Sequence, residues 1–480
     1  MLVAGVDSST QSAKVVLCEA EDGTVVGRGS APHPAGTEAD PALWWTALRQ
    51  AGDGLLDRAA AVGVAGQQHG MIVLDDDAQV IRPALLWNDL RSASAAAELV
   101  AEFGGPQWWA SNVGSVPTAS FTVTKLRWLA KHEPEHAARA SAVLLPHDWL
   151  TWWLMGGPGG TGAPAARRAQ RVTEPVTDRG DASGTGYFSP ATGAWRPDLA
   201  EAALGHPVAV PRVAGPAEVV GHTGWGAALS AGTGDNMGAA LGLGLRPGDV
   251  AVSIGTSGTA FAVSDAPADD PSGAVAGFAD ATGRFLPLVC TINAGLVLSA
   301  TASILGTDLD GLSALALGAE PGAGGISLLP YLDGERTPDR PAATGVLRGI
   351  TTRNATRENL ARAAVEALLA SLADAADRIT GEEGQPPRRV LLIGGGARSD
   401  AVRRLAPGIF FSEVLVPEPE EYVALGAARQ AAWALAGTPE PPPWPQRAAA
   451  SYAGEPQPEI RERHAALRAD TATWDERTAS

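Results

Sequence analysis

Short apolar runs alternate with longer mixed segments along the first half of the chain. Strands are predicted at Leu2–Val6, Ala13–Glu19 and about Gly23–Gly29, where β-branched and apolar residues lie between turn-forming residues. A helix is predicted from Pro41, and the apolar run AAVGVAG that follows it predicts another strand. A further helix is predicted around Lys125–Lys131, after the start signal TASFT.

The second half of the chain repeats this order of elements. Strands are predicted at Val250–Ile254 and Ala260–Val263, followed later by a helix and by the strand RVLLIGG. The helix is the clearest in the chain, because Thr356 is suited to its N-cap and apolar residues recur on one face. Those apolar residues are Leu360, Ala364, Leu368 and Leu372.

Strands followed by strand–helix alternation, twice over, predict two α/β domains. We expect an N-terminal domain at residues 1–245, a C-terminal domain at 246–437, and a proline-rich linker with a helical tail at 438–480. The glycine-rich segment Gly156–Gln170 contains a G-x-G-x-x-G match, but it has no clean strand–helix context and is interpreted as a surface loop.

Composition narrows the class of protein. The chain has 480 residues, more than one hydrophobic core usually supports, and 45% of them are hydrophobic. Its formal net charge of −17 argues against nucleic acid or an anionic membrane as the main partner. The first strand begins at Leu2 without a signal-peptide pattern, and polar residues interrupt the apolar stretch Phe285–Thr307. We therefore expect a cytoplasmic protein.

Two hairpin signals, GVDSSTQSAK and SIGTSGTA, occupy matching places in the two halves. Each would expose successive backbone N–H groups and hydroxyls, which can cradle a phosphate. Asp7 is expected at the tip of the first hairpin, with Thr256 in the matching place, and an aspartate there could hold Mg²⁺. This asymmetric duplication points toward phosphoryl transfer, although each hairpin taken singly is also typical of an ordinary turn, and Asp7 of an Asx turn.

Two other glycine-rich segments could approach a ligand closely. GTGDNMGAALGLGL places Asp235 just before an Ala/Leu-rich helix, where it could act chemically or serve only as an N-cap. LLIGGGARSD ends a buried strand in Gly394, Gly395 and Gly396, which would leave bare backbone for a flat ring or a phosphate.

Polar side chains suited to a polyol follow the strand AAVGVAG. GQQHGM and RPALLWNDLRS supply amide, imidazole and carboxylate groups beside an indole ring. Each of these groups could instead be a satisfied buried polar residue. The segment YLDGERTPD is a charged turn for which the sequence predicts no role. A Walker-type phosphate loop, a protein-kinase motif set, a G-x-S-x-G elbow and an HExxH motif do not occur in the sequence.

Taken together, these motifs resemble the FGGY carbohydrate kinases. The resemblance rests on GVDSSTQSAK, GQQHGM, RPALLWNDLRS, TDRGDASGTGYF, GTGDNMGAALGLG, SIGTSGTA, PYLDGERTPD, LLIGGGARSD and EYVALGAARQAAW, in the family's order, from residue 1 to about 437. It implies two actin-like (ribonuclease H-like) ATPase domains with ATP and sugar in a cleft between them. It further implies a kinase of xylose metabolism that uses ATP and Mg²⁺ to phosphorylate D-xylulose.

The resemblance also implies roles for individual residues. Asp235 matches the catalytic base, and Asp7 the aspartate associated with Mg²⁺ and ATP. The segments assigned to the sugar contain Gln68, His69, Trp87, Asn88, Asp89 and Asn236. The segments assigned to the nucleotide contain Ser9, Thr10, Gln11, Lys14, Gly255, Thr256, Ser257, Gly394, Gly395, Gly396 and Ser399.

Departures from the family pattern and rival functions remain open at this point. The family often has Met where this chain has Gln68, and a polar residue where it has Leu425, while Gly156–Gln170 looks like an insertion. The acceptor could be another polyol such as ribulose, glycerol or gluconate. A non-catalytic actin-like ATP-binding regulator is the alternative from another class, against which Asp7 and Asp235 both count. A homodimer is left open.

Overall fold

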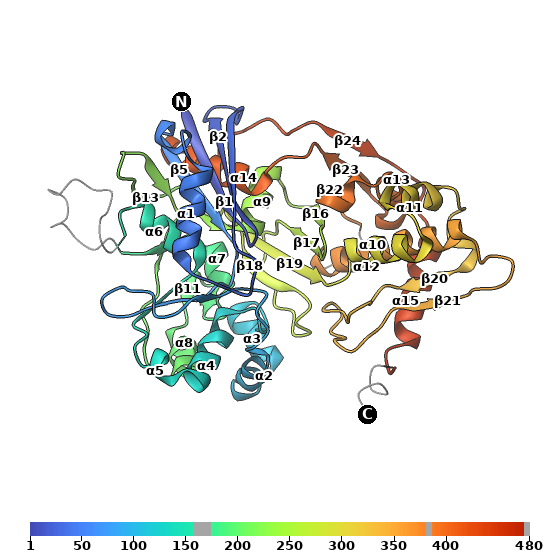
Figure 1. Ribbon diagram of the computed structural model, residues 1–480, viewed down its shortest axis with the longest axis horizontal. Helices are drawn as coiled ribbons and strands as arrows, with labels where there is room; N and C mark the ends of the chain where they lie inside the picture. The colour runs from blue at the N-terminus through green and yellow to red at the C-terminus, as the bar shows by residue number, and fades with distance from the viewer. Residues whose placement is uncertain (158–173, 381–385, 475–480) are drawn as a thin grey trace. The chain divides into compact units, whose positions relative to one another are not determined.

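The computed structural model describes residues 1–157, 174–380 and 386–474, in two compact units (Figure 1). The first unit comprises Met1–Gly244, Ser264–Leu286 and Glu420–Gln446, and the second Leu245–Val263, Pro287–Pro419 and Arg447–Ser480. Both units are thus discontinuous in sequence, whereas the domain boundaries expected above are continuous and stay a prediction. Residues 158–173, which hold most of the expected surface loop, lie outside the described residues.

The main sheet of the first unit has the strand order β13-β14-β5-β1-β2-β3, with β15 also pairing β5. Strand β1 is antiparallel to β2 and parallel to β5, and β2 is antiparallel to β3. These strands are β1 (Leu2–Ser8), β2 (Ser12–Glu19), β3 (Val25–Pro32), β5 (Ala61–Gly66), β13 (Val219–His222), β14 (Ala228–Ser230) and β15 (Thr233–Gly234). The short strands are β4 (Glu38–Ala39), β6 (Ile72–Leu74), β7 (Ala84–Leu85), β8 (Ala142–Leu144), β9 (Val176–Thr177), β10 (Phe188–Ser189), β11 (Ala194–Trp195), β12 (Arg212–Val213) and β18 (Ala276–Ala279).

Helices pack on both faces of this sheet. One face carries large apolar side chains, and the other carries glycines. Large apolar residues such as Val6, Val15 and Val64 share a core with Trp44 of α1 and Trp149 of α6, and α1 lies along the sheet in Figure 1. The helices are α1 (Pro41–Ala51), α2 (Ala93–Glu102), α3 (Pro106–Val113), α4 (Thr122–His132), α5 (Pro134–Ala137), α6 (Pro146–Leu154), α7 (Arg179–Ser183), α8 (Pro197–Leu204), α9 (Asp235–Leu243) and α14 (Tyr422–Ala436), with the 3₁₀ helix η1 (Leu56–Arg58).

The other face of the sheet carries glycines that admit helix α14. A Cβ atom on Gly5 would lie 1.8 Å from the carbonyl oxygen of Ala424, and one on Gly63 would lie 2.3 Å from that of Ala427. Only glycine permits this approach of helix and strand backbones. Leu425, the departure from the family pattern, is buried in the same helix.

The sheet of the second unit repeats the strand order of the first. It runs β19-β17-β16-β22-β23-β24, with β16 antiparallel to β17 and parallel to β22. Its strands are β16 (Asp249–Ile254), β17 (Gly258–Ala262), β19 (Phe285–Thr291), β22 (Arg389–Ile393), β23 (Glu413–Pro417) and β24 (Ala449–Tyr452), beside a ribbon of β20 (Ser327–Leu329) and β21 (Val346–Arg348). The helices are α10 (Gly295–Leu305), α11 (Leu309–Leu317), α12 (Arg357–Thr380), α13 (Asp400–Phe410) and α15 (Pro458–Asp470), with the 3₁₀ helices η3 (Ala323–Gly325) and η4 (Gly395–Arg398).

Most elements expected from the apolar pattern are present, with shifted ends. Helix α4 begins three residues before the predicted Lys125, and β1 continues past Val6 to Ser8. The predicted N-cap of α12 is confirmed, because the Thr356 hydroxyl accepts a hydrogen bond from the amide of Asn359 at 3.2 Å. The apolar stretch from Phe285 forms β19 and α10, and among the described residues there is no helix whose length and apolar character would let it span a bilayer.

Candidate active site

Asp7 lies in strand β1 rather than at the tip of the hairpin, and its Cα is paired with that of Lys14 across the β1–β2 ladder. Its side chain is almost fully buried, and the Ser9 hydroxyl donates to its carboxylate at 2.5 Å. Burial raises the pKa of Asp7 to about 6, although the Ser9 hydrogen bond and the Lys14 charge oppose this shift. Asp7 is therefore a buried carboxylate directly beside the predicted phosphate turn Ser9–Gln11.

The other residues of this hairpin have partners within the first unit. Lys14, expected as an extra cation for phosphate, forms a 2.7 Å ion pair with Glu421. The Thr10 hydroxyl accepts a hydrogen bond from the Trp87 indole at 2.8 Å and donates one to Gln67 at 3.3 Å. Trp87, which the sequence assigned to the sugar, thus touches a residue assigned to the nucleotide.

Asp235 is the first residue of α9, and the N-cap position belongs to Gly234, so the interpretation of Asp235 as a mere N-cap is wrong. Its carboxylate accepts hydrogen bonds from the backbone and side-chain amides of Asn236, both at 2.8 Å. Removal of the carboxyl from water, and then the negative charge of Asp7, raise the pKa of Asp235 to about 7. The two predicted catalytic aspartates therefore lie close enough to interact.

Gln68 links three segments that are far apart in sequence. Its side chain is buried, its amide nitrogen donates to the Gly180 carbonyl at 3.4 Å, and its oxygen accepts from Asn236 at 3.4 Å. The end of β5, the start of α7 and the start of α9 consequently meet beside Asp235. The structure thus brings together Gln68, Asn236 and Asp235 as a single polar group.

His69 combines an unusual backbone with a fixed ring. Its φ of 67° is rare for a residue with a side chain. Its Nδ1 lies 2.5 Å from the Gly184 carbonyl oxygen, which can only accept, so Nδ1 carries a proton. Phe121 and Phe278 pack against the ring, with centroids 4.8 and 5.8 Å away. Part of the role of His69 is therefore structural.

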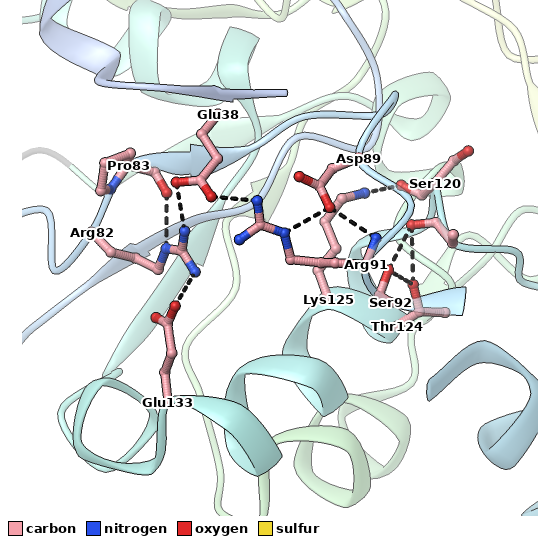
Figure 2. Close-up of polar contacts among 11 residues, drawn as sticks. Glu38, Arg82, Pro83, Asp89, Arg91, Ser92, Ser120, Thr124, Lys125 and Glu133 are labelled. Atoms are coloured by element: carbon pink, nitrogen blue, oxygen red, sulfur yellow. Dashed lines mark hydrogen bonds and ion pairs between the residues drawn. The ribbon is translucent and has the colours of Figure 1, made fainter. Parts of the chain in front are cut away.

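Asn88 and Asp89 are held by other polar groups of the first unit. The Asn88 amide donates to the Gly36 carbonyl at 3.3 Å. Figure 2 shows the Asp89 carboxylate accepting the backbone amide and Nε of Arg91, at 3.0 and 2.8 Å. Burial alone would raise the pKa of Asp89, but the Arg91 hydrogen bonds outweigh it and hold this pKa below its usual value. The side chains of Asn88 and Asp89 are therefore held by Gly36 and Arg91, and Asp235 is not among these partners.

Lys125 is a buried amine that sequence reasoning placed only on a helix. Its side chain is fully buried, and Figure 2 shows its Nζ donating to the Ser120 carbonyl. Nζ also lies 3.3 Å from the carbonyl oxygen of His69. Burial lowers the pKa of Lys125 to about 7, against the opposing attraction of Asp89. Lys125 therefore helps to hold the left-handed backbone at His69.

The two glycine segments assigned to the nucleotide adjoin each other within the second unit. Gly255–Ser257 connects β16 to β17, directly after Ile254. A Cβ atom on Gly394 would lie 2.8 Å from the Ile254 carbonyl oxygen, and one on Gly396 would lie 2.2 Å from the Ile254 side chain. A Cβ on Gly395 would meet nothing within 4 Å. The third assigned position, Ser399, caps α13 and accepts the Val402 amide at 3.5 Å.

A fully buried cluster beneath the Gln68 segment escaped the sequence reasoning. His147 Nδ1 lies 2.7 Å from Asp181 and 3.2 Å from Asp148, and its Nε2 lies 3.1 Å from the Ala231 carbonyl oxygen. Because both ring nitrogens face acceptors, both carry protons, and the ring is an imidazolium. Burial alone would lower the pKa of His147, but the aspartates outweigh it and raise this pKa to about 10. The one available signal was a His-Asp pair inside the apolar segment PHDWLTWWL.

This cluster adjoins the strands that carry the candidate site. A Cβ atom added to Gly232 would lie 2.4 Å from the His147 ring, and one added to Gly66 would lie 2.8 Å from the His147 Cβ. The ring therefore packs against backbone just before Thr233, and the base of the side chain packs against backbone just before Gln67. Asp178 caps α7 through the amides of Gly180 and Asp181 and also accepts the Thr233 hydroxyl at 3.2 Å. The buried charges thus join α6, α7 and β15 next to Asp235.

Comparisons with known proteins agree with this arrangement. The N-terminal domain of the FGGY family of carbohydrate kinases matches residues 2–243, and its C-terminal domain matches residues 250–435. A xylulose kinase of Streptomyces coelicolor is 46% identical over 91% of this chain and 88% of its own length, and one of Escherichia coli is 35% identical over 91% and 90%. The crystal structure of a xylulose kinase from Bifidobacterium adolescentis, 45% identical, superposes with a TM-score of 0.90 over 98% of this chain and 99% of its own. The expected α/β fold of two actin-like domains is confirmed, and the chain belongs to the FGGY family of carbohydrate kinases.

Proposed function

We propose that this carbohydrate kinase transfers the γ-phosphoryl group of ATP to the primary hydroxyl of D-xylulose and so forms D-xylulose 5-phosphate. ATP is the substrate that membership of this kinase family implies. The relatives named above support D-xylulose as the acceptor. The observation that carries the proposal is the pair of Asp7, which is buried, and Asp235, which is partly buried. They are two interacting carboxylates with raised pKa values beside Gln68 and Asn236.

Asp235 is the general base in this proposal. A carboxylate whose pKa is about 7 is part ionised at neutral pH and accepts a proton more readily than an ordinary aspartate. It would take the proton of the attacking hydroxyl while the phosphoryl group transfers in line. The Asn236 amide, which donates to the Asp235 carboxylate, fixes the orientation of the base.

The residues of the first unit fit a magnesium ion. Mg²⁺ prefers carboxylate oxygens and water, and Asp7 offers a carboxylate whose pKa is raised by burial. We assign the ion to Asp7, together with the phosphate oxygens of the nucleotide. When bound, it would neutralise charge on the β- and γ-phosphates. Gln68 and His69 are assigned to the ketose.

The second unit supplies the remaining nucleotide segments. The backbone amides of Gly255–Ser257 are assigned to the phosphates, as are those of Ser9–Gln11 in the first unit. Gly394, Gly395 and Gly396 are assigned to the adenosine, because Gly395 presents backbone without a nearby side chain. These assignments follow the motifs.

A coupled assay of ADP formation with a panel of acceptors tests the proposed function. The panel contains D-xylulose, D-ribulose, glycerol and gluconate, each at several concentrations. We expect the highest kcat/KM with D-xylulose. A higher value with another acceptor would reassign the substrate. ADP formation that is unaffected by every acceptor would contradict sugar phosphorylation by this chain.

Replacing Asp7 tests its assignment to Mg²⁺ and ATP. For Asp7→Ala, we expect the KM for Mg–ATP to rise roughly tenfold to a hundredfold, the usual cost of losing one contact to a charged group. The KM for the ketose should change little. Calorimetry with ADP, with and without Mg²⁺, checks the ion directly, because the variant should lose most of the Mg²⁺ dependence. Asp280→Ala, which removes a buried aspartate of the same unit that has no assigned role, is the control, and equal losses for ATP and ketose would refute the assignment.

His69→Ala separates recognition of the sugar from packing. We expect kcat/KM for the ketose to fall about tenfold to a hundredfold, because a substrate hydroxyl in the site would lose its partner. The Tm should also fall, because the Gly184 carbonyl loses its donor and Phe121 loses a ring contact. Phe278→Leu disturbs the same packing and keeps the imidazole. If both variants lower the Tm and leave the ketose KM unchanged, His69 is a structural residue only.

A further inference from the structure

The loop of YLDGERTPD, for which the sequence predicted no role, contains a buried carboxylate. Glu335 is 1% exposed. One of its oxygens accepts the amides of Ile292 at 2.6 Å and Arg336 at 2.8 Å, and the other accepts the Asn293 side-chain amide at 3.0 Å. A buried carboxylate is costly to desolvate unless such donors surround it. Its position is therefore fixed by the segment between β19 and α10.

Asn293 fastens the same segment to the loop a second time. It is fully buried, its amide nitrogen donates to the Gly334 carbonyl at 2.7 Å, and its oxygen accepts the Leu332 amide at 3.0 Å. The loop is also held at its far end, because the backbones of Glu335 and Arg340 pair with each other. Arg340 in turn donates to the Thr471 carbonyl at 2.6 Å, after helix α15. Because the loop is fixed at both ends, its contacts with Ile292 and Asn293 hold the start of α10 in one position.

The start of α10 packs directly on the turn Gly255–Ser257. The Gly295 amide donates to the Gly255 carbonyl at 2.9 Å, and the Leu296 amide lies 3.4 Å from the Thr256 carbonyl oxygen. A Cβ atom on Gly295 would lie 2.5 Å from the Gly255 oxygen, so the contact is tight enough to require glycine. A shift of Ile292 and Asn293 would therefore displace Gly295, two residues further on, and with it the backbone of Gly255.

We propose that Glu335 is a positioning residue for nucleotide binding, which holds the phosphate turn Gly255–Ser257 in place through Asn293 and the start of α10. The inference rests on the proposed function only in taking this turn as a phosphate site. Glu335 does not touch the nucleotide in this account. It acts because a cradle of backbone amides binds phosphate well only when its geometry is held before the ligand arrives.

Glu335→Gln is the first test, since it keeps the size of the side chain but turns an NH₂ group toward N–H donors. We expect the KM for ATP to rise roughly tenfold to a hundredfold, through lost hydrogen bonds that order the turn. The KM for the ketose, whose assigned residues lie in the first unit, should change less than about twofold. Affinity for ADP, measured by calorimetry without sugar, should fall by the same factor as the affinity for ATP.

Glu366→Gln is the matched control. Glu366 is a buried glutamate of the same unit, on α12, and accepts Arg362 at 2.7 Å and the Gly322 amide at 2.9 Å. It should lower the Tm and leave ADP affinity unchanged. If Glu335→Gln behaves like this control, or weakens ATP and ketose equally, the proposal is wrong.

Two further variants keep the test decisive if Glu335→Gln does not fold. Asn293→Ala removes the middle of the connection, and Gly295→Ala pushes α10 away from Gly255 while Glu335 stays intact. Both should weaken ADP selectively, and an ADP affinity equal to wild type in both would overturn the proposal. The proposed function fails by a different result, a wild-type protein that binds ADP but phosphorylates none of the sugars.

Discussion

Asp235→Asn should lose roughly a hundred- to ten-thousandfold in kcat while it keeps the fold and the affinity for ATP, since that range is the usual worth of a general base. The amide has nearly the shape of the carboxylate but cannot accept the proton of the attacking hydroxyl. Its oxygen can still accept the Asn236 amide, which now donates to the Asp235 carboxylate at 2.8 Å. The expected loss is therefore chemical rather than structural.

The wild-type enzyme should show the titration of this base. Since Asp235 must be ionised to accept a proton and its pKa is raised to about 7, kcat/KM should rise as the pH increases through about 7 and level off above it. Asp7→Asn removes the negative charge that contributes to the shift, so the rising limb should move to lower pH. Asp235→Asn should abolish the limb. Kinetics between pH 5.5 and 8.5 at saturating Mg–ATP measure all three.

Asp280→Asn is the matched control for these measurements. Asp280 is a buried aspartate of the same unit whose carboxylate accepts the Thr282 amide at 2.9 Å, within a turn of the β18–β19 hairpin. It should lower stability and keep both kcat and the pH limb. Near-normal kcat in Asp235→Asn, or an unchanged limb, would remove Asp235 from the role of base.

Local patterns were enough to predict the elements that build the site. The strands around both hairpins and the N-cap of α12 follow from apolar runs, turn residues and capping chemistry, which act over a few residues. The approach of Ile254 to Gly394 and Gly396 is a long-range contact, whereas the run of glycines after β22 was predicted from its place after an apolar strand. Such features are legible because nearby residues determine them.

Long-range packing could not be predicted from local sequence patterns in the same way. Helix α14 belongs to the first unit, although the chain reaches it only after most of the second, because Gly5 and Gly63 leave room for its backbone against β1 and β5. The sequence of α14 itself does not indicate that it packs on β1 and β5. The position of Asp7 in β1, rather than in the turn, depends likewise on the register with β2.

Buried charges were the largest omission. A charged residue in a sequence usually indicates a solvated surface, and only tertiary contacts show that Lys125, His147 and Glu335 are buried with partners. Asp181, the partner of His147, is 34 residues away in sequence, and His69, a partner of Lys125, is 56 residues away. The segment TDRGDASGTGYF supported the family resemblance, but its pairing with His147 required the fold.

His147→Ala should be the most destabilising of these substitutions, by about 3–5 kcal/mol, the range measured when one partner of a buried ion pair is removed. It leaves Asp148 and Asp181 buried without their cation, and one oxygen of each already has no hydrogen-bond partner in the structure. Urea denaturation followed by far-UV circular dichroism measures the loss. Hydrogen exchange of α6 and α7 should locate it.

The loss should depend on pH in a defined direction. Since the pKa of His147 is raised in the folded protein, its contribution is complete below about pH 6.5 and is lost as the pH rises toward about 10. Burial raises the pKa values of Asp148 and Asp181, so their ionisation also destabilises the fold as the pH rises. Without the imidazolium these carboxyls should hold their protons longer. Above pH 6.5 the fading contribution of His147 alone would shrink the difference between variant and wild type. Two carboxyls that keep their protons in the variant outweigh this one imidazolium, so the difference should be smaller at pH 5.5 than at pH 8.

A double substitution decides whether charge or packing is responsible. Asp181→Asn in the His147→Ala background removes one of the stranded carboxylates, and it should recover part of the lost stability at pH 8. In the wild-type background the same substitution removes the negative charge that pairs with the imidazolium at 2.7 Å and should destabilise. The two effects of Asp181→Asn thus have opposite signs if the imidazolium balances the aspartates. Equal and additive losses in both backgrounds would show that His147 contributes only its volume, and that the ring is not the charge that joins α6, α7 and the strand leading to Asp235.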